Sequence, residues 1–257
     1  VLFIGGGGFS GPKRFAAEYD ATVDVAEIDP DVVRAAEEYF RADEYDINTY
    51  MQGGRQFLQE TDNTYELVVL DAYKRDKVPF QLTTREFMDL VTERLSPDGM
   101  AVANIISSSS GPASEFYRAE YKTMNASFGQ VYAFPTSDTG AIQNIELVAT
   151  KSDTRLTQEQ LRERNQDREI GIDLAEAIDG YTTDVPTEDV PVLRDDRAPV
   201  DRLLDSMVGQ RYVIEETGSG SGDDDTNTTE PAAAWGDPAL TVRDGGAVTR
   251  GQGLHIR

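Results

Sequence analysis

A run of glycines between an apolar segment and a candidate helix restricts the fold more than any other part of the chain. Four glycines at residues 5–8 follow an apolar start, and a helix is expected to open at Pro12. Within this stretch Gly6, Gly8 and Gly11 match the pattern G-x-G-x-x-G. Residues without a Cβ allow the backbone to turn sharply, lie against a ligand and direct helix N–H groups at it. The stretch is therefore typical of a strand-turn-helix unit that approaches a ligand.

An acidic residue, Glu27, ends the next apolar segment, which begins at Val23. In nucleotide-binding sheets an acid at this place accepts hydrogen bonds from ribose hydroxyls. The glycine turn and Glu27 together predict a site for an adenosine-containing small molecule. Taken separately, the glycines also fit an ordinary tight turn, and Glu27 also fits a solvated strand end.

Segments typical of strands alternate with segments typical of helices. A nicotinamide-type sheet keeps its parallel alternation to the end. Here the last two expected strands have no helix between them, so they predict a hairpin. We expect an α/β protein with a Rossmann-like, S-adenosylmethionine-dependent methyltransferase fold, in which a seven-stranded, mostly parallel sheet ends in an antiparallel hairpin. After the two strands above, the remaining five are expected at residues 47–51, 65–71, 100–106, 130–134 and 142–150.

The apolar run at residues 65–70 ends in Asp71. Ligands of open parallel sheets bind beyond the carboxyl ends of the strands. We therefore expect Asp71 and Glu27 to face one crevice with the glycine turn, and residues 72–82 to cover it. A structural acid or helix cap at Asp71 is the alternative.

Three further local signals are present. Thr83 and Glu86 have the spacing of a capping box that opens a helix. Residues 97–99, Pro-Asp-Gly, predict a turn. Arg55 is expected on a helix surface, paired with a neighbouring glutamate rather than reaching into the site.

Composition changes divide the chain into three parts. Residues 1–152 are expected to form the nucleoside-binding catalytic domain, and residues 153–216 a helical extension packed on it. Residues 217–257 are rich in Gly, Ser, Asp and Thr without apolar periodicity, and we expect them to be a disordered acidic tail. Because the chain starts inside an expected strand at Val1, we also expect an upstream region.

The formal charge of −23, from 47 acidic and 24 basic residues, bears on partners and surroundings. Nucleic acid is not expected as a partner, because phosphate binding needs a basic surface. Acids spread over most helices suggest an acidic surface adapted to molar salt, and an acidic face for a cationic substrate such as a polyamine is the rival interpretation. With no cysteine and one histidine, at 255, neither thiolate chemistry nor a metal site is expected.

Seven short motifs stand in an order that resembles the spermidine synthase family of polyamine aminopropyltransferases, and most closely its spermidine synthase-like branch that is often fused to a membrane domain. Together they span about residues 1–205. The motifs are IGGGG (4–8), VAEID (25–29), GGRQFL (53–58), VVLD (68–71), LTTREF (82–87), LSPDG (95–99) and DDRAPVD (195–201).

The resemblance implies a protein that binds decarboxylated S-adenosylmethionine and transfers its aminopropyl group to an amine. Asp71 would lie near the attacking amine, and the expected catalytic residues are Asp71 and Tyr73. Tyr73 would stack over the ligand, and packing under the loop is the alternative. Glu27 would hold the ribose and Ile28 would lie against the adenine. The expected nucleoside-binding residues are Gly5, Gly6, Gly7, Gly8, Glu27, Ile28, Gly53 and Gly54.

The motifs depart from the family pattern at three acidic positions. Gly8 stands where the family has Asp, Gly53 replaces the Asp of Gly-Asp-Gly, and Lys74 replaces the last acid of Asp-Ser-Ser-Asp. The alternatives are a methyltransferase that uses S-adenosylmethionine, or a non-catalytic nucleoside-binding domain of a membrane-associated protein. We expect a cytoplasmic protein, and leave open a membrane tether through an upstream region and assembly into a homo-oligomer.

Overall fold

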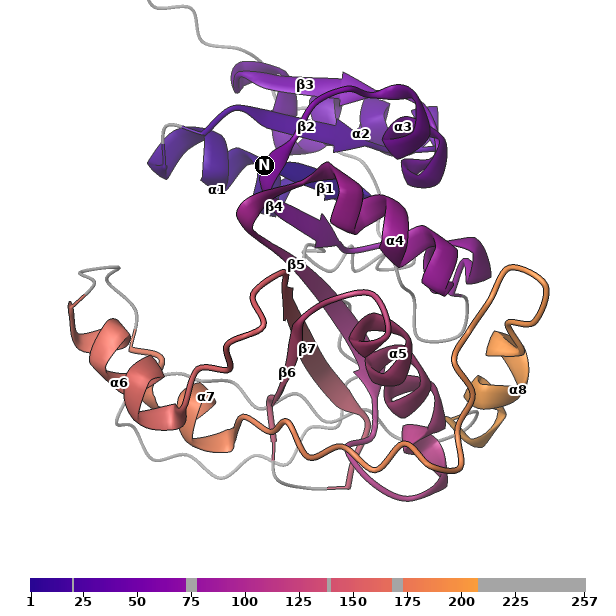
Figure 1. Ribbon diagram of the computed structural model, residues 1–257. Helices are drawn as coiled ribbons and strands as arrows, with labels where there is room; N and C mark the ends of the chain where they lie inside the picture. The colour runs from indigo at the N-terminus through magenta and orange to yellow at the C-terminus, as the bar shows by residue number, and fades with distance from the viewer. Residues whose placement is uncertain (20, 73–77, 138–139, 168–172, 208–257) are drawn as a thin grey trace, which may run out of the picture.

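The computed structural model describes residues 1–19, 21–72, 78–137, 140–167 and 173–207, and these residues are built around one mixed β-sheet (Figure 1). Its seven strands stand in the order β3-β2-β1-β4-β5-β7-β6. Their bounds are β1 Leu2–Ile4, β2 Val23–Ala26, β3 Ile47–Tyr50, β4 Tyr65–Leu70, β5 Leu95–Ser107, β6 Gln130–Pro135 and β7 Gln143–Thr150.

The strand directions confirm the expected fold class. β1 pairs in parallel with β2 and β4, β2 with β3, and β4 with β5. β7 runs antiparallel to both β5 and β6, so the last two strands form the hairpin that the missing helix predicted. The chain has crossed the sheet in both directions from β1, which puts the reversal of strand order between β1 and β4.

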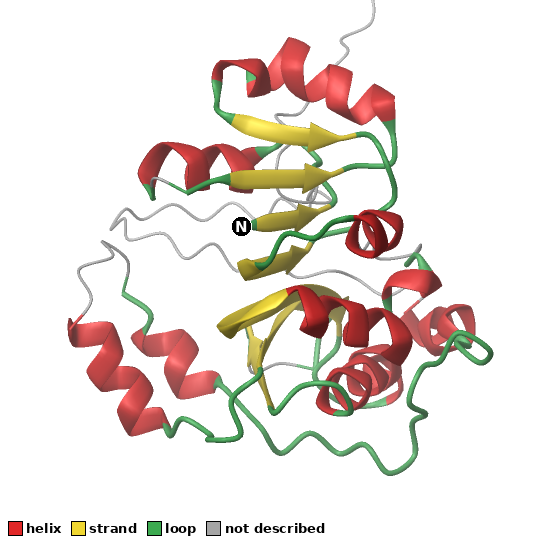
Figure 2. Ribbon diagram, turned by 45° about the horizontal axis from the view of Figure 1, so that its top comes forward, coloured by secondary structure: helices red, strands yellow, loops and turns green. Residues whose placement is uncertain are grey.

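Helices cover both faces of the sheet (Figure 2). The longer ones are α1 Ser10–Glu18, α2 Pro30–Phe40, α3 Gly54–Glu60, α4 Arg85–Arg94, α5 Glu115–Asn125, α6 Gln158–Asp167, α7 Ala175–Gly180 and α8 Val200–Leu204. Four single turns of 3-10 helix are η1 Ala42–Glu44, η2 Phe80–Leu82, η3 Pro112–Ser114 and η4 Asp205–Met207.

The period-2 alternation of the strands divides the apolar residues between two cores. Phe3 and Val25 pack with Val33 of α2 on one face, in a cluster that also takes in part of α1. Leu2 and Ile4 point to the other face and join the larger cluster under α3, α4 and α5. Because the three residues of β1 are buried on both faces, this strand is fixed from both sides.

Two local predictions differ from the structure. The segment 97–99 lies within β5 and not in a turn, because the register jumps from Tyr65 opposite Leu95 to Leu67 opposite Met100 and leaves the residues between as a bulge. The cap of α4 is Thr84, one residue later than expected, and its Oγ1 accepts the N–H of Phe87.

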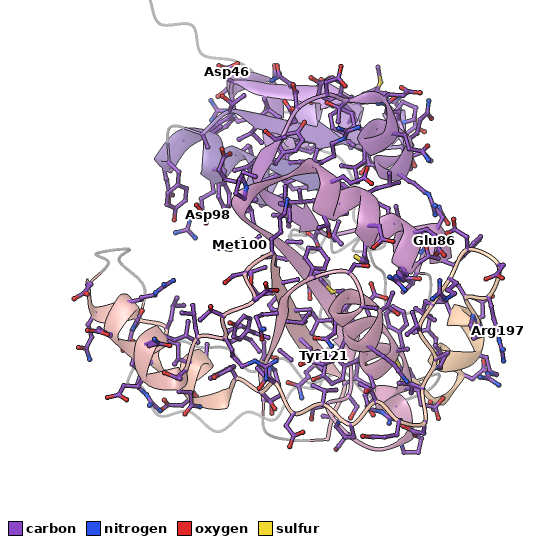
Figure 3. All side chains as sticks on the ribbon, in the orientation of Figure 1. Asp46, Glu86, Asp98, Met100, Tyr121 and Arg197 are labelled. Carbon is purple, nitrogen blue, oxygen red and sulfur yellow. The ribbon has the colours of Figure 1, made fainter. Side chains whose placement is uncertain are left out.

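The segment that precedes α8 returns to the sheet domain and is tied to it by charged hydrogen bonds. Asp195 accepts two hydrogen bonds from the Arg55 guanidinium, at 2.7 and 2.5 Å, and a third from the Thr84 hydroxyl at 2.7 Å. Glu86 accepts the backbone N–H of Asp195, and Figure 3 shows Glu86 on α4 facing the loop that carries Arg197. Arg55 therefore pairs with Asp195 and not with a neighbouring glutamate, and Asp195 ties its segment to α3 and to the start of α4.

None of the helices in the described ranges is both long enough and apolar enough to cross a bilayer.

Candidate active site

A cleft of about 450 Å³ lies at the carboxyl ends of β1, β2 and β4, where the strand order reverses. This is the place where open α/β sheets bind their ligands. Its walls come from the glycine turn, the ends of β2 and β4, the start of α3 and the η2 turn. The lining residues are Ile4, Gly5, Gly7, Ala26, Glu27, Ile28, Asp29, Val32, Gly53, Gly54, Arg55, Asp71, Ala72, Pro79, Gln81 and Leu82.

The glycine turn needs residues without a Cβ at two positions that line the cleft. Gly5 has φ +94° and Gly7 has φ +50°, conformations that side-chain-bearing residues rarely adopt. A Cβ on Gly5 would stand 2.8 Å from the carbonyl oxygen of Asp71, whereas a Cβ on Gly7 would meet no atom within 4 Å. The space that Gly7 leaves therefore belongs to the cleft, and Gly5 permits the turn to touch the end of β4.

Glu27 is buried at the end of β2, and its carboxylate holds the turn in place. Oε2 accepts the Gly6 N–H at 2.9 Å, and Oε1 accepts the Asp29 N–H at 2.9 Å. A carboxylate oxygen has two lone pairs, so both oxygens retain one for another donor. Glu27 can therefore bind the hydroxyls of a ribose while it orders the backbone around it.

Two of the predicted glycines do not line the cleft. A Cβ on Gly6 would collide with the Phe9 ring at 2.3 Å, and a Cβ on Gly8 would lie 3.5 Å from the ring of Phe40. Gly6 contributes its N–H to Glu27, and it leaves room for Phe9, which is buried with φ +56°. The G-x-G-x-x-G spacing thus combines residues that border the ligand space with residues that pack the turn.

Ile28 and the second glycine pair form the opposite wall. Ile28 is 70% exposed and lines the cleft, so a group bound there would contact its apolar side chain. A Cβ on Gly53 would lie 3.6 Å from Ile28, and one on Gly54 would collide with Ile4 at 2.3 Å. The start of α3 therefore packs closely against β1, and the apolar side chain of Ile28 stays accessible at the wall of the cleft.

Asp71 stands directly after β4 and is exposed to the cleft. Its backbone N–H donates to the carbonyl of Ile4 at 3.0 Å, so its position is fixed by β1. Partial desolvation of the carboxyl by the surrounding protein raises the pKa of Asp71 above its ordinary value, and a hydrogen bond from the Asn104 side chain opposes that rise. Asp71 is therefore a carboxylate suited to accepting a proton at the edge of the cleft.

Two further polar residues lie beside Asp71 that sequence patterns did not identify. The side chain of Asn104 on β5 is hydrogen-bonded to the Asp71 carboxyl. Glu146 on β7 is close enough for electrostatic repulsion from Asp71. Burial, and secondly the charge of Asp71, raise the pKa of Glu146 to about 7. The available signal was a polar residue within each of two apolar strands, Asn104 in AVANII and Glu146 in IELVA.

Most of the predicted site residues come together. Gly5, Gly7, Glu27, Ile28, Gly53, Gly54 and Asp71 border one cleft, with Gly6 bound to Glu27 and Gly8 behind the turn. Of the loop at residues 72–82 that was expected to cover the crevice, four described residues line it: Ala72, Pro79, Gln81 and Leu82. Tyr73 and Lys74 lie outside the described residues.

Sequence comparison finds relatives for this part of the chain. The sequence model of the spermine/spermidine synthase domain matches residues 1–128. A polyamine aminopropyltransferase of Vibrio vulnificus is 32% identical over 139 residues, which are 52% of this chain and 45% of the relative. A probable polyamine aminopropyl transferase of Bifidobacterium longum is 29% identical over 217 residues, 76% of this chain and 48% of the relative. The chain thus spans about half the length of the curated relatives it matches.

Solved structures with the same architecture include enzymes of two kinds. A probable spermidine synthase from Corynebacterium glutamicum has a TM-score of 0.54 and 20% identity, with 64% of this chain and 61% of that chain covered. Human methyltransferase-like protein 13 in complex with SAH has a TM-score of 0.54 and 18% identity, with 69% of this chain and 79% of that chain covered. At such identities these likenesses establish the fold alone.

Proposed function

Residues 1–128 place the chain in the spermine/spermidine synthase family, and from this premise we propose that it transfers an aminopropyl group from decarboxylated S-adenosylmethionine to an amine. One observation carries the proposal. Glu27 and Asp71 border a single cleft together with Gly5 and Gly7 of the glycine turn. The nucleoside and the attacking amine would therefore meet where β1 and β4 end.

The nucleoside fits the first half of the cleft by its chemistry. Its ribose hydroxyls are donors, and Glu27 retains a lone pair on each oxygen to accept them. Its adenine is planar and apolar on its faces, which suits the exposed side chain of Ile28. Gly7 leaves open space beside the turn, so the chain of the ligand can pass close to the backbone.

Asp71 supplies the chemistry that the transfer requires. The lone pair of a neutral amine attacks the methylene carbon beside the sulfonium, a C–N bond forms, and the C–S bond breaks with its electron pair returned to sulfur. Methylthioadenosine leaves as a neutral thioether, and the proton that the new ammonium sheds passes to the Asp71 carboxylate. A raised pKa makes Asp71 a stronger proton acceptor than an ordinary aspartate, and its fixed backbone holds the amine in line with the leaving sulfur.

Two acids of the family motifs are replaced by glycine in this chain, so the proposal covers aminopropyl transfer and does not specify the acceptor amine. At Gly8 a side chain would face Phe40, and Gly53 faces Ile28, so neither position offers a carboxylate to the adenine or the amine. Asp71 is the acid retained from the family motif that follows β4. The amine is therefore recognised through Asp71 and whatever polar groups adjoin it.

The decisive experiment supplies each nucleoside together with an amine. We expect methylthioadenosine to form from decarboxylated S-adenosylmethionine and putrescine, and Asp71→Asn to lower kcat by about 10²–10⁴-fold, the usual contribution of a general base. Asp98→Asn, at the amino end of β5, removes an exposed acid away from the cleft and serves as the matched control (Figure 3). Methylated amine from S-adenosylmethionine would instead assign methyl transfer, and absence of binding by any nucleoside would refute both.

A further inference from the structure

One wall of the cleft comes from the η2 turn, and the side chain of Arg55 joins this turn to α3. Gln81 and Leu82 of η2 line the cleft, as does Arg55 at the start of α3. Nη1 of the Arg55 guanidinium donates to the carbonyl oxygen of Gln81 at 3.3 Å. The position of this wall therefore depends on where the Arg55 guanidinium lies.

Asp195, in the segment that returns to the sheet domain before α8, fixes that guanidinium. Its two carboxylate oxygens accept hydrogen bonds from both terminal nitrogens of Arg55, at 2.7 and 2.5 Å. A bidentate pair of this kind sets the plane and the direction of the guanidinium as well as neutralising its charge. Asp195 therefore determines how Arg55 meets the carbonyl of Gln81.

The start of α4, which follows η2 directly, holds Asp195 in turn. The Thr84 hydroxyl donates to its Oδ1 at 2.7 Å, and Glu86 accepts its backbone N–H at 3.1 Å (Figure 3). The Arg85 N–H donates to the carbonyl of Leu193, in the same returning segment, at 2.8 Å. The described residues that line the cleft do not include Asp195. Its carboxylate thus joins α3, α4 and the returning segment from outside the ligand space.

We propose that Asp195 is a positioning residue for nucleoside binding, which acts through Arg55 to hold the η2 wall where the nucleoside meets it. The inference rests on the proposed function for the assignment of the cleft to the nucleoside. It adds that a residue outside the cleft sets the affinity, because only molecules with the wall in place bind. It also gives the segment after β7 a part in a cleft whose described lining residues all lie between Ile4 and Leu82.

The chain supplies a matched control, because another arginine joins the same returning segment to the sheet domain away from the cleft. Asp189 accepts hydrogen bonds from both terminal nitrogens of Arg118 on α5, and the Arg118 side chain is 12% exposed. The described residues that line the cleft include neither of them. Asp189→Asn therefore removes a bidentate pair of the same kind and leaves the η2 wall tied.

Binding is measured by calorimetric titration with methylthioadenosine, at a temperature where the wild type and each variant are folded. In Asp195→Asn we expect the affinity to fall about threefold to tenfold, because loss of the pair lowers the population of molecules with a positioned wall. In Asp189→Asn the affinity should be unchanged.

Hydrogen exchange of the free proteins, read by mass spectrometry over residues 78–84, reports the wall itself. The N–H groups of Leu82 and Thr83 close the η2 turn, and they should exchange faster in Asp195→Asn than in the wild type or in Asp189→Asn. Saturating methylthioadenosine should restore slow exchange, since binding and wall position are linked. Arg55→Lys keeps the charge and loses the fork of donors, so it should show the same faster exchange.

The outcomes separate this inference from the proposed reaction. Equal affinities in Asp195→Asn and the wild type, or equal losses in Asp195→Asn and Asp189→Asn, overturn the role of Asp195. Faster exchange at η2 in both variants does so as well, because it indicates a general loosening. If the wild type binds no methylthioadenosine, the proposed function fails, and exchange in the free proteins alone then supports or refutes the positioning of the wall by Asp195.

Discussion

The carboxylate of Glu27 accepts the Gly6 N–H at 2.9 Å, so the acid at the end of β2 holds the turn that follows β1. Its second oxygen accepts the Asp29 N–H. The residue that the ligand would touch is thus the residue that shapes the backbone around the ligand.

Glu27→Gln should weaken nucleoside binding more than it weakens the fold. The amide replaces one accepting oxygen with a donor, which then faces a backbone N–H and lacks a partner. We expect the affinity for methylthioadenosine to fall at least about tenfold, since hydrogen bonds to a charged group contribute about 1.5–3 kcal/mol. Calorimetric titration measures it, with Glu66→Gln on the exposed side of β4 as the control. Equal affinities in the wild type and Glu27→Gln would contradict a role in binding.

Alanine at the two positive-φ glycines should have different costs. Gly5→Ala combines a strained φ of +94° with a Cβ 2.8 Å from the Asp71 carbonyl, and we expect it to lower the free energy of unfolding by about 3 kcal/mol. Gly7→Ala meets nothing within 4 Å, and the αL strain alone should cost about 1 kcal/mol. Urea unfolding gives both values. A reversed order would show that the turn rearranges.

Ionisation of Glu146 should lower stability as the pH rises. Its pKa is about 7 in the folded protein against an ordinary 4.5, so the folded state binds this proton more tightly than the unfolded chain does. The contribution is fully present below the unfolded pKa and is lost as the pH rises through about 7. Between about pH 5 and pH 8 the wild type should lose more stability than Glu146→Gln, in urea unfolding at constant salt. Parallel pH profiles would contradict the assignment.

The ion pair between Arg55 and Asp195 should stabilise the return of the C-terminal segment. Its bonds are bidentate, at 2.7 and 2.5 Å, and the Arg55 side chain is 22% exposed. We expect Arg55→Ala to cost about 1–2 kcal/mol of unfolding free energy. Arg14→Ala breaks an exposed pair with Glu18 on one helix and should cost under about 0.5 kcal/mol. Similar losses in the two variants would show that the link to Asp195 adds nothing.

The net charge of −23 predicts a salt-dependent stability. The Debye length, over which charges interact, is about 30 Å at about 0.01 M salt and about 3 Å at about 1 M salt. Repulsion among the acids should therefore weaken, and the unfolding temperature should rise by several degrees between these concentrations of potassium chloride. A scan in differing potassium chloride at fixed pH tests this, and a constant unfolding temperature would exclude a surface adapted to salt.

The sequence was sufficient for the sheet and for the side of the site that holds the nucleoside, because both depend on local patterns. Apolar runs alternating with helices predict a parallel sheet, and the missing helix before β7 predicts the hairpin. Glu27 and Asp71 each end an apolar run, so their meeting at one edge follows from the direction of the strands. Their distance in sequence did not matter.

What could not be predicted depends on register and on distant partners. Asn104 lies opposite Glu146 only because β7 pairs with β5 in one particular antiparallel register. No local pattern in the sequence specifies this register, because α5 and β6 separate the two strands in the chain. Arg55 finds its acid 140 residues later in the chain, where no spacing rule applies. The cap at Thr84 was displaced by one residue because two threonines stand side by side and both suit the position.

The close approach of Gly5 to the Asp71 carbonyl couples the glycine turn after β1 to the acid after β4, so that neither can move without the other. The Asp71 N–H is also bonded to Ile4, the residue before the turn. A ligand that shifts the turn must shift the acid too, so the binding free energies of nucleoside and amine should be linked. Linkage is reciprocal: whatever factor the nucleoside adds to the affinity for the amine, the amine adds to the affinity for the nucleoside.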